Sequence, residues 1–349
     1  MADSVQKRYN IGLALLKLWM CYEVVMVHFW SLGTTNWKVP PGTWLIEAMR
    51  AYAVPVFMLT SFFLAAERFR RNDGAWLRSR FVRLVVPFAS WSLISSAVFA
   101  ALSPFSEVFK VTFRDLGYQL MLGTTKALGS QMWFQAVLII LTAFFAAFFR
   151  LVRPRHVAVG LLAVFAVAEV LDYTGLNKWL FEGFCFEVRN PLGRVFPMMP
   201  YAVLGLIAGT RRADWAELPA ATRMSLAAAG ALAAWFFIGC EVFVKPPGFY
   251  YCGLKMFAVA ASLFTAFHFL PLERLPGCVH AGVAFASRFS MGVYFAHIFV
   301  GRIAENFLFP HMGLAAQTFK AGCVVFLLTW LFCLLASLIP CRWTKLLLE

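Results

Sequence analysis

Apolar runs of about membrane length follow one another along nearly the whole chain, separated by short polar segments. A helix that crosses the hydrocarbon core of a bilayer needs about 20 mainly apolar residues. The pattern therefore predicts ten spanning helices, at residues 11–31, 44–66, 81–103, 131–150, 156–174, 195–210, 222–244, 251–271, 283–309 and 317–340. The predicted fold class is an all-α polytopic membrane protein of about ten transmembrane helices.

Composition agrees with this reading. Among the 349 residues 61% are hydrophobic and 14% are charged, whereas charged residues make up roughly 25% of soluble domains. We predict one membrane domain over residues 9–340, with short tails at 1–8 and 341–349. The polar start MADSVQKRYN has no small-residue cleavage site, so the first helix is expected to be retained.

The distribution of lysine and arginine predicts the orientation. With a cytoplasmic N-terminus, the inner segments carry 17 of these residues and the outer loops carry 9, as the positive-inside rule requires. Both termini are then cytoplasmic. The net charge of +14 follows from this bias and from attraction to anionic membrane lipids, so we expect no nucleic-acid partner.

The eight cysteines show no CxxC pair and no cysteine–histidine spacing typical of a metal site, and we expect no metal site. Most read as small apolar residues, while Cys240 and Cys252 flank one hairpin and are a possible pair. Glu47 and Arg50, one turn apart in the second span, most simply form an internal ion pair.

The first span contains "KLWMCYEVVMVHFW", which places Lys17, Glu23 and His28 where charge is costly. Eleven positions separate Lys17 from His28, so both lie on one helix face, within about 20° and about 16 Å apart along the axis. Glu23 lies off this face, and we expect it to pair with another helix, or else to tune His28. The simpler alternative is a snorkelling lysine and a packed histidine.

The third span opens with "RSRFVRLVVPF", in which Arg80 and Arg83 are one helical turn apart and Arg78 is close by. Guanidinium groups bind phosphate in a bidentate fashion, which suits a phosphorylated ligand entering from the cytoplasm. Topology bias and lipid phosphates explain Arg78 well. They explain Arg83 poorly, because it already lies inside the apolar run.

These stretches resemble a known family. "KLWMCYEVVMVH" is similar to the R/K-x10-H element of the acyltransferase-3 family of integral membrane acyltransferases, and "RFVRLVVP" resembles its RxxR element followed by proline. Four further stretches fall in the family's order, namely "VPVFMLTSFFLA", "MWFQAVLI", "FPMMPYAVLGLIAG" and "SMGVYFAHIF". The resemblance covers about residues 9 to 340.

The resemblance implies a membrane O-acetyltransferase that moves an acyl group, commonly acetyl, from cytoplasmic acyl-CoA to a sugar or glycan hydroxyl. Lys17, Arg80 and Arg83 would then hold the phosphates of the carrier, with the thioester near His28. His28 would act as general base, or would carry a covalent acyl group. The implied location is a bacterial inner (plasma) membrane.

Further site candidates depend on the same resemblance. Trp133, Tyr294 and His297 are candidates for oxyanion stabilisation, and packing is the alternative for each of them. Arg194, placed just before the sixth span, is a candidate for contacting the acceptor, with ordinary loop charge as its alternative.

Two other functions stay open at this stage. A transporter would use the buried Lys17, Glu23, His28 and His297 for proton relay or substrate binding, and would show only gradient-driven flux. A receptor or scaffold would need no embedded charge, and it is disfavoured by five basic residues within the spans, namely Lys17, Arg50, Arg83, Lys255 and Arg302.

Overall fold

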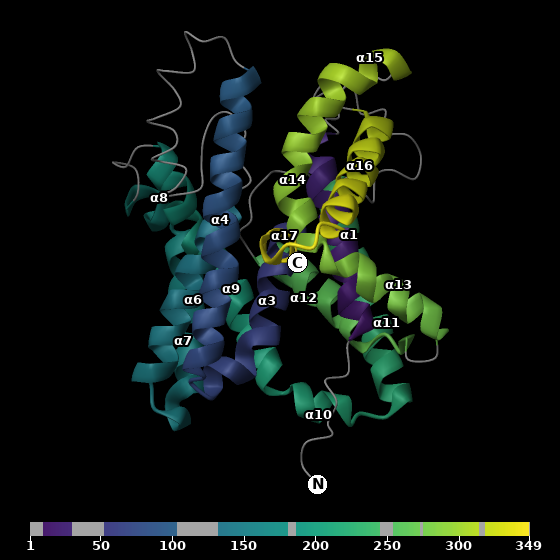
Figure 1. Ribbon diagram of the computed structural model, residues 1–349. Coiled ribbons are helices and arrows are strands. Elements are labelled where there is room, and N and C mark those ends of the chain that lie inside the picture. Colours follow the sequence, from purple (N-terminus) through teal and green to yellow (C-terminus); the bar gives the residue numbers. More distant parts are fainter. Residues whose placement is uncertain are drawn as a thin grey trace.

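The computed structural model describes residues 10–29, 52–102, 132–180, 186–244, 254–272, 275–313 and 318–348, and every regular element within these ranges is a helix (Figure 1). The longer helices are α1 (Ile11–Phe29), α3 (Ala53–Arg70), α4 (Gly74–Leu102), α6 (Trp133–Leu151), α7 (Val157–Tyr173), α9 (Phe186–Thr210), α11 (Ala220–Val244), α12 (Leu254–Phe269), α13 (Gly277–Arg288), α14 (Ser290–Ile303) and α16 (Phe319–Ser337). Shorter ones are the 3-10 turn Pro154–His156, α8 (Leu176–Leu180), α10 (Arg212–Ala216), the π-helical turn Ala304–Leu308, α15 (Phe309–Met312) and α17 (Arg342–Leu348).

Six of the described helices are long and apolar enough to cross a membrane, at Ile11–Phe29, Trp133–Leu151, Pro154–Leu171, Leu192–Thr210, Ala220–Gly239 and Phe319–Ser337. Large apolar side chains are exposed along several of them, as with Leu327, Leu331 and Leu335 on α16. An exposed apolar stripe of this kind suits contact with lipid. The chain is therefore an integral membrane protein, while the total of ten spans and the side on which the termini lie stay predictions.

The helices form two groups that meet at α1 and α3 (Figure 1). On one side α9 packs along both α3 and α7, and α6 contacts α9 and α4. On the other side α11 packs along α12, and α14 packs on α16. Helix α1 contacts α3 from the first group and α12, α13, α14 and α16 from the second. Helix α1 consequently lies at the junction between the two groups.

The predicted spans differ from the helices in three places. The span predicted at 283–309 is not one helix, because α13 ends at Arg288 and α14 begins at Ser290, with a bend of 55° between them. Helix α4 starts before residue 81, at Gly74, and α9 starts before residue 195, at Phe186. Arg194 therefore lies within α9 and not in a loop that precedes it. Cys252, Glu47 and Arg50 lie outside the described residues.

Two glycines one turn apart let α9 approach α3 closely. A Cβ atom at Gly205 would overlap the backbone of Leu59, and one at Gly209 would overlap the backbone of Phe63. Small residues at such positions permit close backbone contact between membrane helices. The contact places the next residues of α3, Thr60 and Ser61, against the interior of the protein.

We expect Gly205→Leu to destabilise the folded protein by about 3 kcal/mol or more, because the new side chain has no space between α9 and α3. The loss is measured as a lower Tm in detergent and a smaller monodisperse fraction. Gly239→Leu is the matched control, since a Cβ atom there meets nothing within 4 Å. Equal Tm values for the two variants would contradict the proposed role of Gly205.

The turn between α3 and α4 is held by Asp73. Its Oδ1 accepts the backbone N–H of Trp76 at 2.9 Å, and its Oδ2 accepts from Arg68 at 2.8 Å. The first bond satisfies a backbone donor at the start of α4. The Trp76 bond, and then the Arg68 contact, lower the pKa of the Asp73 carboxyl below its usual value. Asp73 thereby stays ionised at neutral pH and anchors the end of α4 that carries Arg80.

The C-terminal segment folds back onto the bundle. Within the predicted tail at 341–349, Arg342–Leu348 form α17, which contacts α4, α14 and α16. Trp91 of α4 donates its indole N–H to the carbonyl of Leu347 at 3.2 Å, and Leu348 is buried. Helix α17 is thus part of the packed structure and supports α14.

Candidate active site

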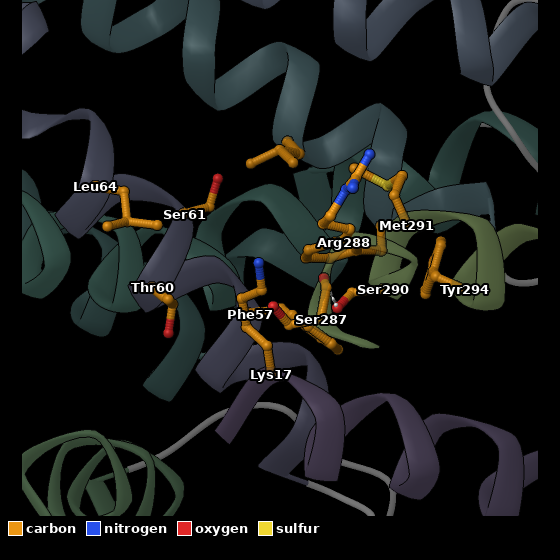
Figure 2. A pocket seen from close by; sticks show the side chains of 12 residues that line it. Lys17, Phe57, Thr60, Ser61, Leu64, Ser287, Arg288, Ser290, Met291 and Tyr294 are labelled. Carbon is orange, nitrogen blue, oxygen red and sulfur yellow. Dashed lines mark hydrogen bonds between the residues drawn. The ribbon is translucent and has the colours of Figure 1, made fainter. Parts of the chain in front are cut away.

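A cavity of about 190 Å³ lies at the junction of the two helix groups, next to the bend between α13 and α14 (Figure 2). Helices α1, α3, α6, α13 and α14 all contribute to its wall, which consists of Lys17, Phe57, Thr60, Ser61, Leu64, Phe134, Leu138, Ser287, Arg288, Ser290, Met291 and Tyr294. Lys17 reaches upward between the α3 residues Thr60 and Ser61 and the α13 residues Ser287 and Arg288 (Figure 2). Two of the residues predicted from sequence, Lys17 and Tyr294, thus face one cavity.

Arg80 lies beside this cavity and not in its wall. Its guanidinium donates to Ser61 Oγ at 2.9 Å and to Thr142 Oγ1 at 3.4 Å, and it lies over the rings of Phe62 and Trp76. These contacts tie α4 to α3 and α6. Because Ser61 lines the cavity, Arg80 reaches the site through one hydroxyl group.

Arg83 does not take part in the contacts that Arg80 makes. Its side chain is exposed on α4, and it is not among the residues of the cavity wall. One helical turn separates the two arginines in sequence, but only Arg80 is turned toward α3 and α6. The structure therefore does not bring the predicted Arg80–Arg83 pair together with Lys17.

His28 and His297 lie against each other near the end of α1. The centroids of their rings are 5.1 Å apart. The close approach depends on Gly301, where a Cβ atom would overlap the ring of Phe29. Glycine at this position lets α14 pack directly on α1. The packing brings together two histidines that are far apart in the sequence.

Hydrogen bonding defines the proton positions of His297. Its Nδ1 lies 3.1 Å from the carbonyl of Val293, which can only accept, so Nδ1 carries the hydrogen. Its Nε2 is buried and makes no hydrogen bond within the part of the chain that the structure describes. In the neutral ring Nε2 is therefore an acceptor. The side chain of His28, in contrast, is exposed.

Aromatic contacts connect the histidines to the remaining candidates. The ring of Tyr294 is 6.2 Å from that of His297 and 5.6 Å from that of Phe134. Trp133 follows beside Phe134, and the guanidinium of Arg194 lies 4.0 Å from the centre of the Trp133 ring. Arg194 is thus placed by a cation–π contact. A row of rings therefore runs from α6 through α14 to α1, and Arg194 of α9 lies at its α6 end.

Glu23 is fully buried, and one of its oxygens accepts the indole N–H of Trp19 at 2.8 Å. Trp19 is one turn earlier on α1, and its ring contacts Phe267 of α12. Glu23 is not in the cavity wall. Glu23 therefore lies where α1 packs against its neighbours. An effect of Glu23 on His28 stays a prediction.

Arg288 lines the cavity but is not among the site residues predicted from sequence. The signal was present, since the predicted span 283–309 contains an arginine between Ser287 and Ser290. A charge within an apolar run marks a functional position by default. The break between α13 and α14 at this point turns Arg288 to the cavity.

The fold and the site together define an integral membrane protein with an internal cationic cavity and a pair of facing histidines. A family model described as an acyltransferase domain matches residues 10–341, which is nearly the whole chain. The chain therefore belongs to the acyltransferase-3 family, and the protein is a membrane acyltransferase. No curated protein and no solved structure matches the chain.

Proposed function

We propose that the protein is an O-acetyltransferase, transferring an acetyl group from cytoplasmic acetyl-CoA to a hydroxyl of a carbohydrate or envelope glycan. The observation that carries the proposal is the position of His28, which faces His297 near one end of α1 while Lys17 faces a cavity earlier on the same helix. The helical rise puts about 16 Å between the two residues. That separation suits a pantetheine arm with its phosphate end near Lys17 and its thioester near His28.

His28 is the proposed general base. It takes the proton of the acceptor hydroxyl as the oxygen attacks the thioester carbonyl. The tetrahedral intermediate then collapses with cleavage of the carbon–sulfur bond. The CoA thiolate takes the proton from the His28 imidazolium, so the products are the acetyl ester and free CoA.

The other candidates take supporting roles in this proposal. Tyr294, which lines the cavity and lies near His297, is best placed to donate a hydrogen bond to the oxyanion. Trp133 and Arg194 lie farther along the row of rings and form a platform for the acceptor. His297 is better suited to accept a proton than to stabilise an oxyanion, because its Nδ1–H is used by Val293.

The proposal predicts transfer of label from radioactive acetyl-CoA by the purified protein in liposomes, with release of one CoA per acetyl group. The acceptor is identified by mass spectrometry of envelope glycans and lipids from cells with and without the gene. We expect an acetyl mass to be missing in the deletion strain and to return on complementation. A protein that moves acetyl-CoA or sugar only along a gradient, without forming an ester, would contradict the proposal.

A further inference from the structure

The wall of the cavity has an unusual charge balance. It contains two cations, Lys17 and Arg288, and none of its described residues is acidic. Lys17 makes no hydrogen bond or ion pair to any other described residue. A cation half-buried among apolar helices is costly unless a ligand neutralises it. The unpaired charge of Lys17 therefore indicates an anionic ligand.

Backbone N–H groups near the cavity also favour an anionic ligand. Helix α14 begins at Ser290, and its first residues Ser290 and Met291 line the cavity. The first turn of a helix has N–H groups without intrahelical acceptors and a partial positive charge. Thr60 is buried in the same wall, and its Oγ1 has no hydrogen-bond partner in the described structure. The N–H groups of this first turn are donors of the kind that a phosphate oxygen requires.

We propose that Lys17 and Arg288 together bind the phosphate at the end of the pantetheine arm of the acyl donor. The proposal rests on the proposed function, and it replaces the pairing of Lys17 with Arg83. Arg80 supports the site indirectly, since it holds Ser61 of the wall from outside. Arg288, at the exposed mouth of the cavity, is then the residue that meets the donor first.

The test compares acetyl-4′-phosphopantetheine with acetylpantetheine, which differ only by this phosphate. The wild-type protein should prefer the phosphorylated donor in kcat/KM by on the order of a hundredfold, as two charge-assisted contacts imply. Arg288→Gln should reduce that preference by about tenfold or more. Arg288→Lys should keep part of the preference for the phosphorylated donor. The lysine variant also tests the site if the glutamine variant fails to fold. The matched control is Arg302→Gln, because Arg302 is an exposed arginine that pairs with Glu305 away from the cavity.

The outcomes separate this inference from the proposed function. If the wild-type protein transfers acetyl from no donor, the proposed function fails. If it transfers acetyl and Arg288→Gln keeps the full preference for the phosphorylated donor, the site at Arg288 is overturned. Assays in nanodiscs of zwitterionic and of anionic lipid test whether the site binds a lipid headgroup phosphate instead of the donor phosphate. Inhibition by anionic lipid that disappears in Arg288→Gln would assign the site to lipid and overturn its assignment to the donor.

Discussion

His28→Ala is expected to reduce acetyl transfer by about 10²–10⁴-fold, the usual contribution of a general base. His28 is exposed and faces His297, and it is the proposed base for the acceptor hydroxyl. Initial rates of label transfer in liposomes measure the loss. If the acceptor reaches this position from solvent, added imidazole should restore part of the activity of the alanine variant.

The control for this variant is His156→Ala, which removes an exposed histidine that bonds to Arg155 in the turn before α7. It should leave the rate unchanged. Full activity of a correctly inserted His28→Ala protein would refute the role of His28. Incubation with acetyl-CoA in the absence of acceptor distinguishes the two forms of the mechanism, since a covalent acetyl-histidine would appear as an added mass on the peptide that contains His28.

His297→Phe is expected to lower kcat by on the order of 10–100-fold, as is typical for a residue that orients a catalytic group. The substitution keeps an aromatic ring in the packing with Tyr294 and Phe29 but removes Nε2, the buried nitrogen that makes no hydrogen bond to the described residues. The KM for the donor should change little, because the proposed phosphate site at Lys17 is about 16 Å from His28 along α1.

A double variant tests how His297 acts. If His297 works through His28, the His28→Ala/His297→Phe protein should be no slower than His28→Ala alone. Losses that multiply would instead show that His297 acts independently, for example on the oxyanion. A change in donor KM alone would place its effect on binding and contradict the positioning role.

Several parts of this site could be predicted from sequence because they depend on spacing along one helix. Lys17 and His28 lie on the continuous helix α1, whose regular geometry places them on one face without any knowledge of its neighbours. His297 and Tyr294 became candidates through family resemblance, and the structure brings both to the same region as His28.

Other parts depended on contacts between helices and could not be predicted. Arg80 and Arg83 look equivalent in sequence, yet Ser61 and Thr142 engage only Arg80. The bend after Arg288 is not visible in a run that reads as one apolar span, and neither is the packing of α17 on α4 and α14. The contact of Arg194 with Trp133 joins α9 to α6, two helices well separated along the chain.

By itself the sequence determined that the protein is a helical membrane protein of the acyltransferase-3 type, and which helix carries the lysine and the histidine. The helical membrane class and the shared face of the lysine and histidine follow from hydropathy and from the fixed rise and turn of a helix, which are local properties. The acyltransferase-3 type follows from the resemblance of several motifs in order along the chain. Only the tertiary structure decided that Arg288, and not Arg83, shares a cavity with Lys17, and that His28 meets His297. The physical reason is that glycines such as Gly205 and Gly301 set how closely helices pack, and that packing selects which side chains meet.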